Sequence, residues 1–150
     1  MISIIEEIVQ GDFGRSVYVA KHPFLNFGVD LASTAAGAYG GYKYAQANGL
    51  DPRVGFSLGL VNGSNIGQLG GELIDRGLRN AENSPYKGKR TVGDAARDFL
   101  IGSAVGNATA HTMASHGLPF AGLGGYVAGE LGKGAYYGLT EPSNEKKKKK

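Results

Sequence analysis

The chain contains no cysteine and no tryptophan, and only three of its 150 residues are histidines. Without cysteine, neither a disulfide framework nor a thiolate metal site can form. His111 and His116 stand five positions apart, whereas two metal ligands on one helix face need a spacing of three or four. Gly132-Lys133 is followed by glycine rather than serine or threonine, so the phosphate-loop pattern is incomplete. The sequence predicts a protein that is not an enzyme and has no cofactor or metal.

Charged residues are also scarce, at 19% of the chain, and two long stretches have none of Asp, Glu, Lys or Arg. These stretches run from Val54 to Gly71 and from Phe99 to Gly129. An uncharged stretch of about 18 residues or more is a candidate for crossing a bilayer. Both stretches are rich in Gly, Ser, Asn and Ala, and the mean hydropathy of the chain is −0.19. We therefore expect them to insert as a cooperating bundle rather than as single spans.

Glycine, proline and asparagine divide the chain into segments with helical patterns. The predicted parts are a short amphipathic helical leader (1–23), a bundle of four Gly-rich helices (24–140) made of two hairpins (24–80 and 91–140) that a polar linker (81–90) joins, and a Lys-rich tail (141–150). The helices themselves are expected at about 23–48, 52–80, 91–116 and 119–139. The predicted fold class is all-α, with the bundle embedded in a membrane.

The two predicted hairpins resemble each other in sequence. The segment from Asp30 to Leu50 aligns without a gap with the segment from Asp98 to Leu118, and each then reaches a proline. Residues 67–70 (Gly-Gln-Leu-Gly) likewise match residues 129–132 (Gly-Glu-Leu-Gly). Either one hairpin was duplicated to give the other, or two Gly-rich hairpins resemble each other through composition alone.

Small residues recur at every fourth position of all four predicted helices. This spacing puts them on one helix face, where the missing side chains leave a groove into which another helix can pack. A glycine costs about 1 kcal/mol relative to alanine in a helix in water, but bilayers tolerate it. We expect Gly63→Leu to disrupt the packing and Gly63→Ala to be mild. The predicted helix-packing residues are Gly37, Gly41, Gly55, Gly59, Gly63, Gly67, Gly71, Gly102, Gly106, Gly125 and Gly129.

Residues 90–106 contain a further pattern, in which Arg90 is followed by Asp94 and then by Gly102 and Gly106. This pattern resembles the second half of the signature of the Tim17/Tim22/Tim23 protein-translocase family, which also has four glycine-zipper spans. The resemblance implies a channel-type subunit in a membrane. The chain departs from the signature at Ile101, where the family has a small residue.

Basic residues are concentrated in the leader, in the linker with its flanks, and in the tail. The turn between the first two helices has only Arg53, and the turn between the last two has no basic residue. A multi-pass arrangement with both termini and the linker on the cytoplasmic-equivalent side satisfies the positive-inside rule. Asp30, Glu130 and Lys133 are expected at membrane depth or at its edge, either as functional charges or in an interhelical pair.

The chain ends in five lysines, and the formal net charge of +3 depends largely on them. They are Lys146, Lys147, Lys148, Lys149 and Lys150. Such a run suits anionic lipid head groups or nucleic acid, and the alternative is a solvated end without a partner.

These features predict a non-enzymatic integral-membrane protein with a structural or assembly role. It would contact the lipid bilayer, and it would bind itself or other membrane or particle proteins through its glycine faces. A lipid-containing virion or a specialised membrane is the expected setting. One alternative is a translocase or channel subunit, which a polar cavity lined by Asn62, Asn65, Gln68 and Asn107 would favour. The other is a soluble helical packing protein in a larger particle.

Overall fold

The computed structural model describes residues 18–84 and 90–140, which form four α-helices and no strand. The helices are α2 (Pro23–Ala47), α3 (Pro52–Ala81), α4 (Val92–Ser115) and α5 (Ala121–Thr140). The predicted all-α class with four helices is confirmed, and each helix begins and ends close to its predicted bounds. Residues 1–17 of the predicted leader, residues 85–89 of the predicted linker and the whole Lys tail lie outside the described residues.

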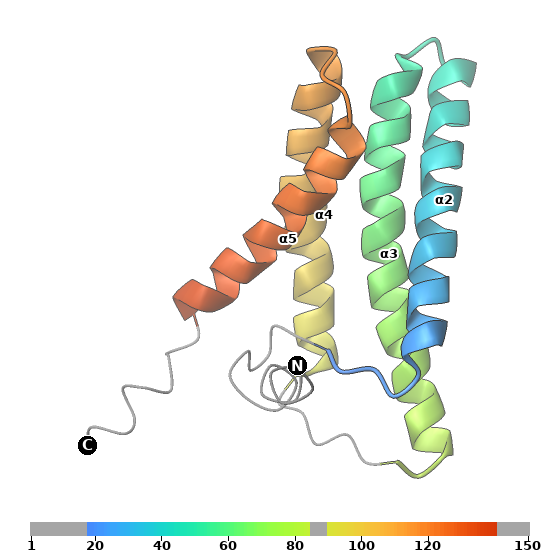
Figure 1. Ribbon diagram of the computed structural model, residues 1–150, viewed down its shortest axis with the longest axis vertical. Coiled ribbons are helices and arrows are strands. Elements are labelled where there is room, and N and C mark those ends of the chain that lie inside the picture. Colours follow the sequence, from blue (N-terminus) through green and yellow to red (C-terminus); the bar gives the residue numbers. More distant parts are fainter. Residues whose placement is uncertain (1–17, 85–89, 141–150) are drawn as a thin grey trace, which may run out of the picture.

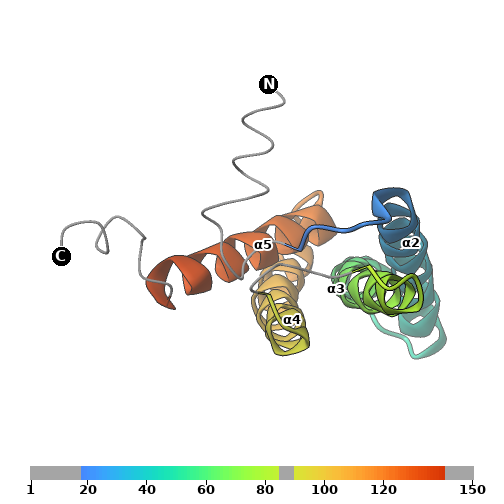
Figure 2. The ribbon, with the colours of Figure 1, turned by 90° about the horizontal axis from the view of Figure 1, so that it is seen from below.

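The four helices form two hairpins that stand next to each other (Figure 1). Helix α3 is central, because it contacts each of the other three helices, whereas α2 contacts α3 alone. Seen from below, α2 lies against one side of α3, and α4 and α5 lie on the other side (Figure 2). Both hairpin tips lie at one end of the molecule, and α5 slants away from α3 toward its own C-terminal end (Figure 1).

The first helix of each hairpin ends in the same way. Gly49 and Gly117 have φ angles of +67° and +70°, which favour glycine. The N–H groups of Leu50 and Leu118 each donate, at 2.9 Å, to the carbonyl five residues earlier. Together with the bond from each glycine N–H, this is the Schellman motif. The two motifs occupy positions that the gap-free alignment of the hairpins pairs.

The second helix of each hairpin begins differently. Asp51 caps α3 by accepting a hydrogen bond from the Arg53 N–H at 2.9 Å, and Pro52 occupies the first helical position. Helix α5 instead follows Phe120, whose φ is +58°. A bulky residue rarely adopts this left-handed conformation, so the backbone is strained at the second tip.

Helix α4 begins with a capping box. The Asp94 N–H donates to the Thr91 hydroxyl at 3.2 Å, and the Asp94 carboxylate accepts from the Thr91 N–H at 2.7 Å. Asp94 therefore has a structural role at this helix start.

The interior of the bundle consists of small and polar residues. Its buried hydrophobic residues are six alanines, Val61 and Tyr137. The buried polar and charged residues are Ser57, Ser64, Asn65, Glu72, Asp75, Arg79, Arg90, Asp94 and Lys133. A core of this composition contributes little hydrophobic burial, because alanine has almost no apolar side chain to remove from solvent.

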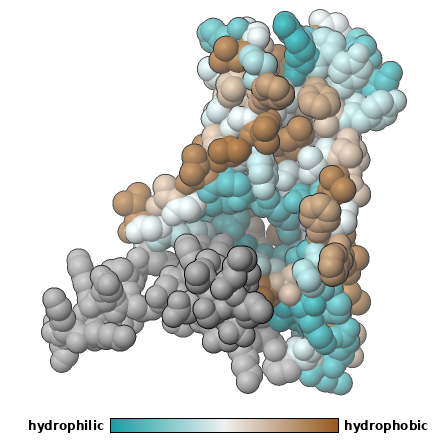
Figure 3. All heavy atoms as spheres, in the orientation of Figure 1, coloured by the Kyte–Doolittle hydropathy of each residue, from teal (hydrophilic) through white to brown (hydrophobic). Residues whose placement is uncertain are grey.

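Large apolar side chains instead lie on the outside. Phe24, Phe120 and Leu131 have exposed fractions of 89%, 79% and 70%. Figure 3 shows hydrophobic bands along α5 and along the N-terminal half of α2, with hydrophilic residues in the hollow between them. Nevertheless, none of the helices in the described residues is both long enough and apolar enough to cross a membrane. Membrane embedding therefore stays a prediction.

Candidate functional site

Seven of the predicted packing glycines lie between α2 and α3. A Cβ atom added to Gly37 would overlap the Gly59 carbonyl oxygen and would lie 2.8 Å from the Gly63 Cα. Gly41 and Gly55 oppose each other in the same way, each against the other's carbonyl oxygen. The backbones of the two helices are thus in direct contact, which allows close van der Waals and Cα–H···O contacts.

The two helices remain close toward the end of the hairpin opposite its tip, which is called the open end below. There, glycines of α3 face side chains of α2. A Cβ added to Gly67 would lie 2.6 Å from the Asp30 Cα, and one added to Gly71 would lie 2.8 Å from the Asn26 Oδ1. These glycines leave the space in which Asn26 and Asp30 fit against α3.

The other four predicted glycines lie where α4 and α5 cross. A Cβ on Gly129 would lie 2.9 Å from the Gly102 carbonyl oxygen. Cβ atoms on Gly106 and Gly125 would lie 2.7 and 2.9 Å from methyl groups of Val61. Val61 belongs to α3 and is fully buried, so this crossing also attaches the second hairpin to the first.

All eleven glycines therefore make their close contacts within the chain. Their predicted use in binding partners is not tested by this arrangement, but the space beside them is already filled. The contacts argue against the expectation that Gly63→Ala is mild, because the new Cβ would overlap the Ser33 carbonyl oxygen and would lie 3.0 Å from the Thr34 Cα. Backbone atoms cannot move aside as a flexible side chain can.

A network of buried ions joins the start of α4 to α3. The Glu72 carboxylate pairs with Arg76 at 2.7 Å and with Arg90 at 2.9 Å, and Arg90 also pairs with Asp98 at 2.6 Å. Burial alone would lower the pKa of the Arg90 guanidinium, but the two carboxylates raise it above its ordinary value. Arg90 thus stays charged and connects α3 to α4.

A second buried carboxylate, Asp75, holds the residues that precede α2. It accepts hydrogen bonds from the Tyr18 hydroxyl at 2.5 Å, the His22 N–H at 2.9 Å and the Arg79 Nε at 3.0 Å. Burial alone would raise the pKa of the Asp75 carboxyl, but the hydrogen bonds from Tyr18 and His22 lower it well below its usual range. Asp75 is therefore a charged anchor for the segment Tyr18–His22.

The sequence reasoning missed both networks. The ion pairs within α3 could have been predicted, because Glu72 and Arg76, like Asp75 and Arg79, are spaced four apart on one helix. The pairing of Glu72 with Arg90 spans 18 positions and a break between helices, so only the tertiary arrangement reveals it.

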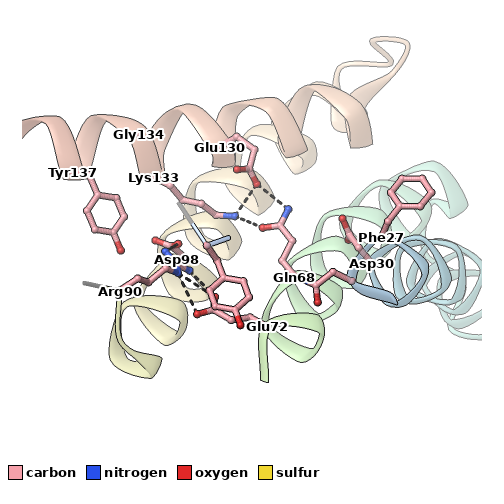
Figure 4. Close-up of a pocket in the computed structure, with 12 residues that line it drawn as sticks. Phe27, Asp30, Gln68, Glu72, Arg90, Asp98, Glu130, Lys133, Gly134 and Tyr137 are labelled. Atoms are coloured by element: carbon pink, nitrogen blue, oxygen red, sulfur yellow. Dashed lines mark hydrogen bonds and ion pairs between the residues drawn. The ribbon is translucent and has the colours of Figure 1, made fainter. Parts of the chain in front are cut away.

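A polar groove of about 510 Å³ opens between α2 and α5 and has α3 as its floor (Figure 4). It brings together the three ionisable residues expected near membrane depth, Asp30, Glu130 and Lys133. The Lys133 ammonium donates to the Glu130 carboxylate at 2.7 Å and to the side-chain oxygen Oε1 of Gln68 at 2.8 Å. Asp30 stands apart from this group and accepts from the Ser64 hydroxyl at 3.1 Å. The groove therefore has the Glu130–Lys133 ion pair on its α5 side and the Asp30 carboxylate on its α2 side.

The chemistry of the groove suits the binding of polar groups. Two buried oxygens in its lining, Asn26 Oδ1 and Asp98 Oδ1, accept no hydrogen bond from the described residues. Across residues 18–84 and 90–140, no three His, Asp or Glu side chains are grouped to hold a metal ion.

The four amide side chains that were expected to line one cavity lie in different places. Gln68 lines the polar groove, and Asn65 borders an adjoining space of about 30 Å³ while donating to the Val61 carbonyl at 3.0 Å. Asn107 donates to Asn62 at 2.8 Å, an interhelical hydrogen bond between α4 and α3. A polar cavity exists, but its lining is mostly ionisable.

Neither the protein-family models, nor the curated proteins, nor the solved structures that were searched contain a match to this chain. The resemblance to the translocase family is not tested by these comparisons and stays a prediction.

The glycine contacts predict opposite effects for two Gly→Ala substitutions. Gly63→Ala should destabilise the chain by about 1–3 kcal/mol, since the added methyl overpacks against backbone. Gly40→Ala, on the same hairpin with nothing within 4 Å of the new Cβ, should be neutral or stabilising by up to about 1 kcal/mol. Denaturant unfolding of the purified chain, followed by circular dichroism, measures both. Equal stabilities of the two variants would contradict the close contact.

The Asp75 anchor predicts a loss of stability in acid. Because its pKa is lowered on folding, its contribution is complete above the ordinary Asp range and declines as the pH falls below about 4. Asp75→Asn should lower the melting temperature at neutral pH and flatten the decline between neutral pH and pH 3. Asp51→Asn removes an exposed carboxylate whose pKa is lowered by its hydrogen bond with Arg53, so it should flatten the decline less than Asp75→Asn does. An unchanged decline in Asp75→Asn would show that other carboxylates are responsible.

Proposed function

We propose that the protein is a non-enzymatic, membrane-embedded structural or assembly protein whose four helices occupy the bilayer as one unit. The reversed distribution of polarity carries this proposal. Phe24, Ile66 and Leu100 have exposed fractions of 89%, 54% and 65%. The exposed fractions of Glu72 and Lys133 are only 3% and 7%. Water disfavours such an arrangement, at about 25 cal/mol for each Å² of exposed apolar surface.

A bilayer favours the same arrangement. Outer side chains then contact acyl chains, close packing between helices relies on small residues, and ionisable groups face the bundle interior in pairs. The contacts between glycine backbones, the Asn62–Asn107 hydrogen bond and the Glu130–Lys133 pair are consistent with this environment. Large exposed apolar surfaces otherwise mark interaction sites or aggregation hazards.

Joint insertion reconciles the proposal with the modest hydropathy of each helix. The run from Val54 to Gly71 is uncharged, and at 1.5 Å per residue it extends over about 27 Å, close to the hydrocarbon thickness of about 30 Å. Of its polar members, Ser57, Ser64 and Asn65 are buried, whereas Asn62 and Gln68 are half-buried and hydrogen-bonded to Asn107 and Glu130. Lipid would therefore contact mainly the apolar residues of this run.

The two ends of the bundle differ in their number of basic residues, which supports one orientation. The open end carries the basic residues Lys21, Arg76, Arg79, Arg90 and Arg97. The end with the hairpin tips carries Lys43 and Arg53. Under the positive-inside rule, the open end would face the cytoplasmic-equivalent side.

The proposed role is assembly of a membrane, in a lipid-containing virion or another specialised membrane. Since the glycine faces are filled within the chain, partners or further copies would contact the outward apolar bands of α2 and α5. The five lysines at positions 146–150 would add an electrostatic contact with anionic lipid or nucleic acid, each contributing about 1 kcal/mol near an anionic surface.

A second candidate function is that of a translocase or channel subunit, and the polar groove favours it. A groove with Asp30, Gln68 and Lys133 beside an apolar exterior could conduct or hold polar segments at membrane depth. Ion conductance or passage of a polar solute in reconstituted vesicles would distinguish this candidate from a purely structural role. A soluble packing protein would instead cover the apolar bands with partner proteins.

The membrane proposal predicts that a charge in the middle of α3 blocks insertion. Ile66→Lys should move the chain from the alkaline-resistant membrane fraction to the soluble or aggregated fraction, because a central lysine costs about 2.5–3.5 kcal/mol. Leu78→Lys makes the same change beyond the uncharged run of the same helix and should stay in the membrane. Carbonate extraction followed by immunoblotting measures both. If the protein is soluble, both variants should stay in the soluble fraction like the unchanged chain, since both side chains are exposed.

The proposed orientation predicts opposite accessibility of the two ends. The chain has no native cysteine, so Leu50→Cys at a hairpin tip and Ser84→Cys at the open end each report a single position. In sealed vesicles an impermeant maleimide should label one variant from outside, and the other only after permeabilisation. Equal labelling of both in intact vesicles, with full retention of a luminal marker, would refute the orientation.

A further inference from the structure

We propose that the slot between the two hairpin tips holds one acyl chain of a membrane phospholipid, with the phosphate of that lipid against Arg53. This inference rests on the proposed membrane embedding. The slot is a cavity of about 430 Å³ at the end of the bundle away from the polar groove. Phe56, Leu60, Leu118 and Phe120 are among its walls.

The lining of the slot selects an apolar occupant. Apart from Tyr42, Arg53 and Ser57, its side chains have no polar atom, so water inside would have few side-chain hydrogen-bond partners. The volume lies within the range of about 300–1,000 Å³ that is typical of ligand cavities. Val61, by contrast, fills its position between helices completely. The slot is thus a site where packing within the chain leaves space for a ligand.

Phe120 gives the slot one wall that the chain itself does not stabilise. Its backbone is in the left-handed region, and its ring is 79% exposed. The strained backbone directs a large apolar side chain to the rim, where contacts from within the chain are few. An acyl chain in the slot would cover this ring and supply the missing contacts.

A phospholipid fits the surroundings of the slot better than a free hydrocarbon. The slot is continuous with the outer apolar surface, because Phe56 and Leu123 line it and are 45% and 55% exposed. Arg53 lies at the same end, where head groups would lie. Its Nε and Nη2 donate to Asp51 at 3.2 and 2.8 Å. Its Nη1 would lie 4.0 Å from a Cβ on Gly117, in the wall of the slot.

This geometry assigns separate tasks to the two parts of the site. Asp51 balances the charge of Arg53, so the attraction to phosphate is a local hydrogen bond rather than a long-range field. Retention of the lipid therefore depends mainly on the apolar walls, and Arg53 fixes the depth at which the head group lies.

The absence of tryptophan allows a direct test. Phe120→Trp places a single fluorophore in the slot, and Val127→Trp places one on the outer face of α5 away from it. Both variants are reconstituted in phosphatidylcholine with brominated acyl chains, which quench tryptophan on contact. The vesicles are then dissolved, and the protein is exchanged into detergent without bromine. Quenching at position 120 should persist, whereas quenching at position 127 should be lost.

Two further variants, made in the Phe120→Trp background, separate retention from simple contact. Leu60→Phe adds a ring to the slot and should abolish the persistent quenching, and Arg53→Gln should shorten its lifetime. Recovery of fluorescence at both positions at the same rate would overturn the proposal, as would persistent quenching that survives Leu60→Phe. Absence of quenching at both positions in the vesicles themselves would instead refute the membrane embedding.

Discussion

Where Gly37 of α2 faces Gly59 of α3, no side chain separates the two backbones. At this distance the helices have no room between them for leucine or phenylalanine, and the space is filled by alanine, serine and the main chain itself. Dispersion and Cα–H···O contacts hold such a pair together, rather than removal of apolar surface from water. Large apolar residues must then point outward, which gives the bundle its reversed polarity.

A polar interior imposes a second condition, because each buried ion must find a partner. Removing one partner of a buried pair costs about 3–5 kcal/mol, since the other charge is left uncompensated. Glu72 with Arg90, and Asp75 with Tyr18 and Arg79, satisfy this condition at the open end of the bundle. These pairs also fix the residues just before α2 and α4, so the two hairpins start from defined positions on α3. The ions therefore determine how the hairpins are joined.

The part of the structure that repeats along the sequence could be predicted. Helix bounds followed from glycine and proline, and spacing four identified the glycines that lie at the contacts between helices. The contacts that no repeat encodes could not be predicted. A spacing of four residues indicates which helix face lacks side chains. It does not indicate whether another chain or the next helix of the same chain packs against that face. It also does not give the distance to Ser33, which decides whether Gly63 accepts a methyl group. The Glu72–Arg90 pair joins residues on either side of a break between helices, so no helical period links them.

The crossing of α4 over α5 explains why one small molecule has two cavities of opposite character. Gly102, Gly106, Gly125 and Gly129 bring the two helices together at one place, with Val61 of α3 between them. The two helices cross at this contact rather than running parallel (Figure 1), and one cavity lies on each side of it. Before the crossing, the first residues of α5 are apolar and the space is the slot at the tips. After it, Glu130 and Lys133 bond to Gln68 of α3, Tyr137 faces the start of α4, and the space is the polar groove. The sequence of α5 changes from uncharged to charged at this crossing. This one crossing thus separates an apolar cavity at the tips from a polar groove farther along the bundle.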